Sequence, residues 1–511
     1  MHIEKNVCDN VLETLLDIPG KSKDHHKARL DMQEMGIREQ LYPIDAGDGR
    51  YVLLPKASFS MTKEEKSIFC SVLKKAKLPQ GCASNIATGV QVKEGKISGY
   101  KSHDAHIIMQ HLLSSAIRKT LPKHVALPLM RLTGFFREIC KRVINPKYLD
   151  RLQAQIVETL CELERIFPPS FFDIIVHLPI HLIDEIKRGG PVCDWWMYPI
   201  ERYLGKLKSY VKNRCRSEAS IAEGYLAEEC LIFCSRYLNA SVKKQSKWFS
   251  KSQEKSNEID EESPLFPKAG FPLGRKKKGK KKGKSYTLDS NTMTLTHRYV
   301  LFNCEDDLVE NYIKEHEEFV KKKSKDRQKR RWKEAQEHSN EFMVWFRGKV
   351  EVNYVPDHIK WLSKGPSSVA RSYTGYFCNG YKFYIRDHDE KCKTQNSGVS
   401  LTALTPSFAS SKDHNLVLGD VTYYGIIRSI IEIDYWSAFS VVLFKCDWFH
   451  MEVDDYGLTR VNFKKLCSKD DPFVLASQVH QVFYTQDDLE EDWYYVNQNF
   501  PRDFFLCRGA I

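Results

Sequence analysis

The spacing of apolar residues predicts helices over much of the first half of the chain. Between about residues 100 and 240, apolar side chains recur every three or four positions, the period of a helix with one buried face. The clearest faces are Ile107, Met109, Leu112, Leu113, Ala116 and Ile117; Leu127, Met130, Leu132, Phe135, Phe136 and Ile139; and Leu149, Leu152, Ile156, Leu160 and Leu163. Pro199 suits the first turn of a further helix that runs to about Asn213. Ser220 and Glu223 have the spacing of a capping box, which predicts another helix to Leu238.

From about residue 370 the apolar period changes to two, which predicts strands. Asn379–Gly380 stands between two apolar runs and predicts a hairpin from Tyr373 to Ile385. Further strands are predicted at the segments 397–404, 421–434, 438–446 and 472–485. Alternating aromatic residues in these strands indicate a small antiparallel barrel or sandwich.

The remaining segments give mixed patterns. Within residues 1–95, a short helix is predicted from Asp9 to Leu16, a strand at Tyr51–Pro55 and a helix from Lys63 to Lys77. Residues 241–295 are rich in Ser, Lys and Glu and are predicted to be a disordered linker, because such a composition cannot offset its ordering entropy. Residues 296–365 are predicted to be a highly charged helical segment.

The net charge of +12 is concentrated in one segment. Residues 241–300 hold 15 Lys and Arg against 6 Asp and Glu, which gives +9 and leaves +3 for the rest of the chain. Most of these charges belong to one basic run, which consists of Arg275, Lys276, Lys277, Lys278, Lys280, Lys281, Lys282 and Lys284. The run fits a nuclear import signal read by an importin-type receptor, a non-specific DNA-binding arm, or a solvated linker. Its length and density favour the first two together, and hence a nuclear protein.

Cysteine usage and hydropathy point to a soluble intracellular protein. Fifteen cysteines, an odd number without any CxxC pair, are better explained as reduced thiols than as a disulfide framework. Cys230 and Cys234 fall on one apolar helix face and are predicted to pack in a core. No apolar run reaches the roughly 20 residues of a membrane-spanning helix.

Several long motifs carry a family resemblance. In the first half they are Met1-His-Ile-Glu-Lys-Asn-Val-Cys-Asp-Asn10, Lys101-Ser-His-Asp-Ala-His106, Leu178-Pro-Ile-His-Leu182, Trp196-Met-Tyr-Pro-Ile-Glu-Arg-Tyr-Leu-Gly-Lys-Leu-Lys208 and Ser220-Ile-Ala-Glu-Gly-Tyr225. In the second half they are Thr394-Gln-Asn-Ser-Gly-Val399, Val442-Leu-Phe-Lys-Cys-Asp-Trp-Phe449 and Asp471-Pro-Phe-Val-Leu-Ala-Ser-Gln-Val-His-Gln-Val-Phe-Tyr484. With these motifs the chain resembles the transposases of plant En/Spm-like (CACTA) transposons over nearly its whole length outside the linker.

The resemblance implies an α+β protein with a defined order of domains. Residues 1–95 would be the C-terminal remnant of an RNase H-like catalytic domain, and 96–240 a helical domain of unknown function. The disordered basic linker 241–295 and the charged helical segment 296–365 would follow. Residues 366–505 would form a small antiparallel β domain, also of unknown function. The chain would then start inside the catalytic domain, at an internal methionine.

The family's chemistry is DNA strand transfer by two aspartates and a glutamate that hold two Mg²⁺ or Mn²⁺ ions. Both ions are needed because the attacking and leaving oxygens of the phosphodiester must each be bound. The resemblance implies that the two aspartates lie upstream of Met1 and that Glu201 is the remaining glutamate, with Glu223 as the alternative. Glu201 would then bind metal only if complemented, and no cofactor is expected for this chain alone. Both glutamates also have structural explanations, Glu201 at a helix N-terminus and Glu223 in the capping box.

Three departures from the family's pattern stand out. Ala105 occupies a position where cysteine is usual, and Arg216-Ser-Glu-Ala-Ser220 lacks the usual glycine before its serine. The ending Leu506-Cys-Arg-Gly-Ala-Ile511 fits no family motif and suggests a frameshift or a truncated reading frame.

Other kinds of site find weaker support. His103, His106 and His111, with Cys82 upstream, could outline a zinc site, but the spacing matches no standard finger. His177 and His181 have the spacing of HExxH without its glutamate. No Gly-x-Ser-x-Gly elbow, GxxxxGK[ST] loop or GxGxxG loop occurs.

Three functions therefore remain open. The first is a truncated, catalytically inactive transposase derivative, and the second is a transposon-derived DNA-binding or regulatory protein. The third is an active nuclease in which Glu201 joins acidic residues such as Asp104 or Asp173. The expected partners are DNA at transposon ends, an import receptor and a second copy of the chain, with no membrane.

Overall fold

The computed structural model describes residues 2–45, 52–82, 85–237, 270–274, 283–323, 330–407, 417–468, 471–487 and 490–499. The chain divides into two compact units. Unit 1 comprises residues 1–76 and 82–258 with the last five residues, and unit 2 comprises 77–81 and 259–506. No described helix is long and apolar enough to cross a membrane.

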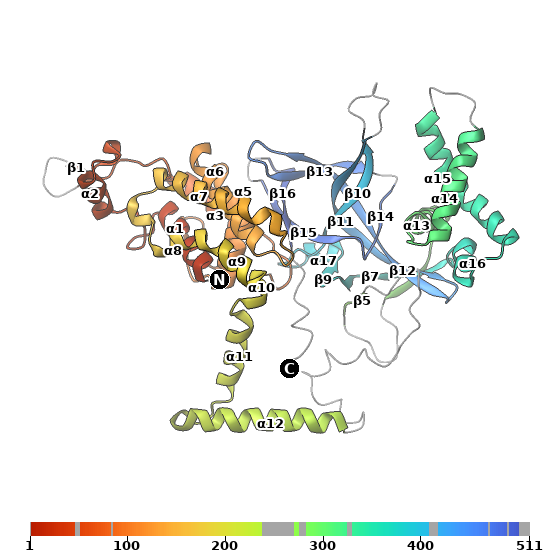
Figure 1. Ribbon diagram of the computed structural model, residues 1–511, viewed down its shortest axis with the longest axis horizontal. Helices are drawn as coiled ribbons and strands as arrows, with labels where there is room; N and C mark the ends of the chain where they lie inside the picture. The colour runs from red at the N-terminus through yellow and green to blue at the C-terminus, as the bar shows by residue number, and fades with distance from the viewer. Residues whose placement is uncertain are drawn as a thin grey trace. The chain divides into compact units, whose positions relative to one another are not determined.

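Unit 1 is built mainly of helices (Figure 1). Its first half contains α1 (His2–Leu15), α2 (His26–Glu34), α3 (Lys63–Lys75) and α4 (Ser102–Ile107), and α4 continues through a π-helical turn (Ile108–Leu112) into α5 (Leu113–Ile117). Two short ladders accompany them, β1 (Ile44–Asp45) with β2 (Val52–Leu53), and β3 (Val90–Gln91) with β4 (Lys96–Ile97). The predicted helical faces form the core, since Leu112, Leu113 and Ile117 are fully buried. No larger sheet occurs among the described residues of unit 1, so the RNase H-like origin of 1–95 stays a prediction.

The second half of unit 1 follows the predicted helical pattern. It consists of α6 (Lys123–Ile139), α7 (Leu149–Ile166), α8 (Ile174–His177), α9 (Leu182–Gly189), α10 (Val192–Trp195), α11 (Tyr198–Ser209) and α12 (Ser217–Tyr237). Pro199 lies in the first turn of α11, as predicted.

The capping box predicted at Ser220 is wrong. The helix α12 begins three residues earlier, at Ser217, after a short 3₁₀ turn that Asn213 caps. The Ser220 hydroxyl instead accepts a hydrogen bond from the backbone N–H of Asn213, at 3.2 Å. A complete capping box does occur at Thr62 and Glu65, where it opens α3.

Unit 2 contains a small closed antiparallel β-barrel, which confirms the predicted β-rich C-terminal part. Its strands are β10 (Gly398–Ser407), β11 (Val417–Tyr435), β12 (Phe439–Val453), β13 (Thr459–Ser468), β16 (Trp493–Gln498) and β15 (His480–Gln486), in that spatial order. The barrel closes because β15 pairs back onto β10 through Val399 opposite Gln481 and Ser400 opposite His480. Tyr424, Phe449 and Tyr484 lie in the core between these strands.

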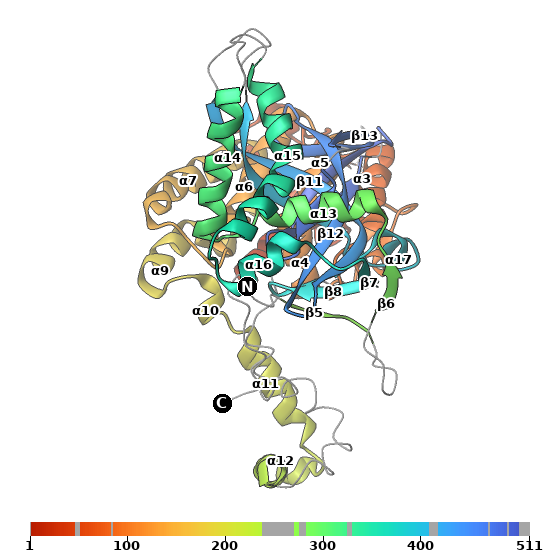
Figure 2. The same cartoon turned by 90° about the vertical axis from the view of Figure 1, so that its right-hand side faces the viewer.

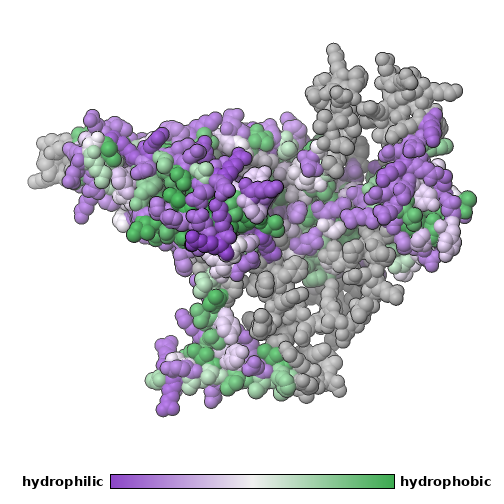
Figure 3. Space-filling model, viewed as in Figure 1, coloured by the Kyte–Doolittle hydropathy of each residue, from purple (hydrophilic) through white to green (hydrophobic). Residues whose placement is uncertain are grey.

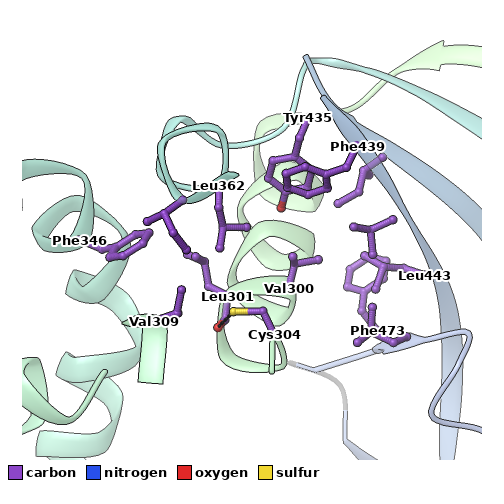
Figure 4. Close-up of a cluster of buried hydrophobic side chains, with 14 of the residues drawn as sticks. Val300, Leu301, Cys304, Val309, Phe346, Leu362, Tyr435, Phe439, Leu443 and Phe473 are labelled. Atoms are coloured by element: carbon purple, nitrogen blue, oxygen red, sulfur yellow. Dashed lines mark hydrogen bonds between the residues drawn. The ribbon is translucent and has the colours of Figure 1, made fainter. Parts of the chain in front are cut away.

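Strands β11 and β12 continue beyond the barrel, and the extension carries a second core. It pairs with β7 (Val369–Tyr373) and β14 (Phe473–Leu475), and β7 pairs with β6 (Lys284–Thr287). The helices α13 (Ser290–Phe302), α14 (Asp307–Lys323), α15 (Arg330–Val352) and α16 (Asp357–Lys364) lie beside it (Figure 2). Figure 4 shows Val300 of α13 on the side of Leu443 of β12, and Leu301 on the side of Phe346 and Leu362. Where the two long strands turn, the rings of Tyr435 and Phe439 are stacked with their centroids 4.6 Å apart.

The hairpin predicted at Asn379–Gly380 is confirmed. It joins β8 (Gly375–Cys378) to β9 (Tyr381–Tyr384), and Cys378 lies opposite Tyr381. Asn379 and Gly380 have φ values of 50° and 82°, the left-handed pair that a tight two-residue hairpin turn requires. The short helix α17 (Arg386–Glu390) follows β9.

Parts of the predicted linker 241–295 are ordered. Gly270–Pro272 forms β5, which pairs with β8, and Lys284–Thr287 forms β6. Helix α13 also begins inside this range, at Ser290. Local composition misses these strands because their partners lie about a hundred residues further along the chain. The predicted disorder of 241–269 and 275–282 lies outside the described residues.

Candidate functional site

Glu201, the candidate catalytic glutamate, lies in the first turn of α11 on the surface of unit 1. Its side chain is 48% exposed, and Nε2 of His2 lies 3.7 Å from its Oε1. An acidic residue in this turn is favoured by the positive end of the helix dipole. The helix dipole is therefore sufficient to explain an acidic residue at position 201.

Glu201 belongs to no metal-binding cluster in the part of the chain that the structure describes. Among the described residues, no group of three or more His, Cys, Asp or Glu side chains is placed to hold a metal ion. The alternative residue, Glu223, is exposed on α12. A two-metal centre needs several carboxylates at one place, and the described part of the chain does not provide one.

Asp104 and Asp173, the acidic residues considered with Glu201, both bind backbone. Asp104 is buried and accepts a hydrogen bond from the backbone N–H of Lys101 at 2.9 Å. Asp173 caps α8 and accepts hydrogen bonds from the backbone N–H groups of Ile175 and Val176, both at 3.1 Å. These contacts are those of helix caps, so they disfavour the nuclease hypothesis.

The lowered pKa of Asp173 is consistent with a capping role. Burial raises its pKa, but hydrogen bonds from Asn10, from the Val176 N–H and from Lys23 outweigh burial, and the pKa is lowered. The carboxylate is thus held in its charged form by fixed donors.

His106 and His111 of the possible zinc site, and the separate pair His177 and His181, have different structural roles. His106 pairs through Nδ1 with Glu4 of α1, and Gln110 donates to the other oxygen of Glu4 at 2.8 Å. His111 is fully buried, and burial with the nearby Arg137 lowers its pKa to about 3. His177 and His181 form a ring pair on the surface, with their Nε2 atoms 3.2 Å apart.

The helices α11 and α12 expose many apolar side chains. They include Ile200, Leu204, Tyr225, Leu226, Leu231 and Phe233, of which Leu231 is 71% exposed. Figure 3 shows hydrophobic residues on the visible face of both helices. Cys230 and Cys234 are exposed on α12, so the prediction that they pack in a core is wrong. The reason is that α12, among the described residues, packs mainly against the neighbouring helix α11 and the 3₁₀ turn before it.

Most of the basic run lies outside the described residues. Arg275, Lys276, Lys277, Lys278, Lys280, Lys281 and Lys282 all belong to that part. Lys284 is described and opens strand β6, opposite Ser372. Its side chain is exposed, so its charge remains available to a partner.

The motif Thr394–Val399 has a structural role that its sequence did not reveal. Asp389 is buried, and its Oδ2 accepts hydrogen bonds from the backbone N–H groups of Asn396 and Ser397 at 2.6 and 2.7 Å. Burial raises the pKa of Asp389, and the two N–H donors act against that effect. The buried carboxylate fixes the loop that leads into β10 of the barrel.

Two family models match the chain. Residues 139–252 match "Domain of unknown function (DUF4218)" and residues 431–496 match "Domain of unknown function (DUF4216)". The first match spans the helices from α7 to α12, and the second spans β12, β13, β15 and β16 of the barrel. Domains of these two kinds are typically found in plant transposase-like proteins. Comparison with curated proteins and with solved structures finds no match.

Proposed function

We propose that this chain is a transposon-derived protein of the plant CACTA class that associates with DNA and has no strand-transfer activity of its own. The two matched domains support the transposon origin. The motifs around Glu201 and Thr394–Val399 support the CACTA class, because they are long and are shared with that family.

The exposed position of Glu201, outside any metal-binding cluster of the described residues, is the observation that carries the inactive assignment. A lone carboxylate at 48% exposure cannot hold two divalent ions, and Asp104 and Asp173 are engaged as helix caps. Strand transfer would need the two further aspartates that the family uses. The Mg²⁺ or Mn²⁺ of the family would therefore bind here only weakly.

A strand-cleavage assay tests this proposal. The full chain is incubated with transposon-end DNA and Mg²⁺ or Mn²⁺, beside a Glu201→Gln variant as the matched control. We expect no cleavage by either protein above a buffer blank. Cleavage by the wild-type chain that Glu201→Gln abolishes would show that the chain is an active nuclease.

The alternative is a DNA-binding or regulatory protein that works through its basic run. The charge distribution favours this function, because +9 of the net +12 lies in residues 241–300. Replacing the seven Lys and Arg of 275–282 by Gln, while leaving Lys284 in β6, should weaken binding to duplex DNA by about tenfold or more at low salt. Filter binding over a salt series measures the effect. An unchanged affinity and salt dependence would show that the basic run does not contribute to DNA binding.

The same run supports a nuclear location through an import receptor. Clusters of this length and density are recognised by receptors with acidic surfaces. A fluorescent fusion of the full chain should concentrate in the nucleus, and the Gln-substituted variant should not. Equal distribution of both proteins would contradict the import role.

A further inference from the structure

A short segment from the N-terminal part of the chain belongs to unit 2. Lys77–Gly81 is part of unit 2, whereas the residues before it, up to Ala76, and after it, from Cys82 to Glu258, belong to unit 1. Helix α3 ends before it, where Ala76 has an extended backbone. The chain therefore passes through unit 2 for five residues and then leaves it.

This segment makes paired hydrogen bonds with the loop 389–397. The backbone N–H of Gln395 donates to the carbonyl of Leu78 at 3.1 Å. The backbone N–H of Gln80 donates to Oδ1 of Asn396 at 2.8 Å. The loop therefore holds the backbone of the segment at two points, once through its own backbone at Gln395 and once through the side chain of Asn396.

The sequence of the segment fits this mode of binding. Leu78 and Pro79 are buried, whereas the side chains of Lys77 and Gln80 are exposed. Pro79 has no N–H, so its burial leaves no backbone donor without a partner. Gly81 ends the segment with φ of +85°, a conformation that glycine adopts without strain. Lys77 adds a contact from Nζ to the carbonyl of Asp389, at 3.3 Å.

The loop is held in the shape that this contact needs. Asn396 is 1% exposed, and its Nδ2 donates to Oγ1 of Thr394, which leaves Oδ1 directed to the segment. The buried Asp389 fixes the backbone of Asn396, and Gln481 of β15 donates to the Asn396 carbonyl at 3.3 Å. The side chain of Gln395 accepts from the backbone N–H of Tyr484. Every one of these anchors comes from unit 2 itself.

We propose that the motif Thr394–Val399 forms a peptide-recognition site whose ligand is the segment Lys77–Gly81 of the same chain. The site recognises a buried Leu-Pro pair, the backbone N–H of the next residue and the glycine after it. This role is independent of DNA binding and of any catalytic activity.

Hydrogen exchange of the full chain tests the proposal. The Gln395 amide is bonded to Leu78, so it should be protected in the wild-type protein. Gln80→Pro removes the backbone donor to Asn396 together with the Gln80 side chain, and the matched control Gln80→Ala removes the side chain but keeps that donor. We expect the exchange rate of peptides covering 389–397 to rise about tenfold or more in Gln80→Pro and to stay at the wild-type rate in Gln80→Ala.

A second variant and a competitor keep the result unambiguous. Leu78→Asp places a carboxylate in the buried position and should raise the exchange of the loop as Gln80→Pro does. A synthetic peptide of residues 75–82, added to the Leu78→Asp protein, should restore protection, and the same peptide with Gln80→Pro should not. An unprotected Gln395 amide in the wild-type chain, or equal loop exchange in all variants, would overturn the proposal.

Discussion

Individual polar residues in this protein are buried with their protonation fixed by their surroundings. His111 lies in the π-helical turn at the centre of unit 1, and burial is the main cause of its lowered pKa of about 3. His297 in unit 2 behaves in the same way, with burial and then Arg347 lowering its pKa to about 4. Both imidazoles are therefore neutral in the folded chain at neutral pH, and each resists protonation on acidification.

His111 should make the stability of unit 1 depend on pH. The unfolded chain binds a proton at His111 below a pH of about 6.5, whereas the folded chain does so only near 3, so the unfolding free energy falls as the pH falls from 6.5. This one group should cost about 2 kcal/mol between pH 7 and pH 5. Urea unfolding of wild type and His111→Gln measures it, and the variant's pH dependence should be smaller by that amount.

The control for this prediction is His26→Gln, because His26 is exposed on α2. Its pH dependence should equal that of wild type. If His111→Gln retained the full wild-type pH dependence, His111 would not be the neutral buried group that the structure describes.

At the scale of elements, the sequence correctly predicted helices and turns that depend on residues close together in the chain. The Asn379–Gly380 hairpin is right because its turn has a specific backbone requirement, and α7 is right because its apolar face repeats regularly. Strand β13 was missed because Lys464 and Lys465 interrupt the alternation, and its pairing to β12 contains two register shifts. The misplaced start of α12 has another cause, since Asn213 and the 3₁₀ turn cap the chain before Ser220.

Gly398 should be essential to the closure of the barrel. A Cβ at this position would lie 2.3 Å from the Val482 carbonyl oxygen and 2.9 Å from the Tyr484 ring, where β10 meets β15. Gly398→Ala should therefore destabilise the chain by about 2 kcal/mol or more. Urea denaturation followed by circular dichroism gives the change.

The matched substitution is Gly419→Ala in β11, where a Cβ would meet no atom within 4 Å. It should leave the denaturation midpoint nearly unchanged. Equal stability of the two variants would mean that β15 does not pack against β10 as closely as described.

At the scale of the whole molecule, the sequence located candidate residues but not their surroundings. Glu201 was correctly expected near a helix start, and only the structure reveals that it belongs to no metal-binding cluster of three or more side chains among the described residues. The role of Asn396 could not be predicted at all. It depends on Leu78 and Gln80, which lie more than 300 positions earlier in the chain.

At the same scale, we propose that the chain self-associates through α11 and α12. Helix α12 is 21 residues long and exposes Leu226, Leu231 and Phe233, a state that is costly in water for an isolated helix. Helix α12 carries four Glu and one Arg, whereas α11 carries three basic residues and one Glu. Within one chain, Lys206 of α11 already pairs with Glu228 of α12, with Nζ and Oε1 2.6 Å apart. A two-fold arrangement of two chains would set the other basic residues of α11 against the acidic α12 of the second copy and would cover the apolar side chains.

Sedimentation velocity over a range of concentrations tests this arrangement. Wild type should form dimers, and Leu226→Lys with Leu231→Lys should sediment as a monomer, because the two lysines oppose the burial of that face. The control is a double lysine substitution at the exposed Val344 and Val352 of α15, which should leave the dimer intact. Monomeric wild type at every concentration would exclude a second copy as the occupant. Dimers that persist in the Leu226 and Leu231 variant would place the contact on another surface.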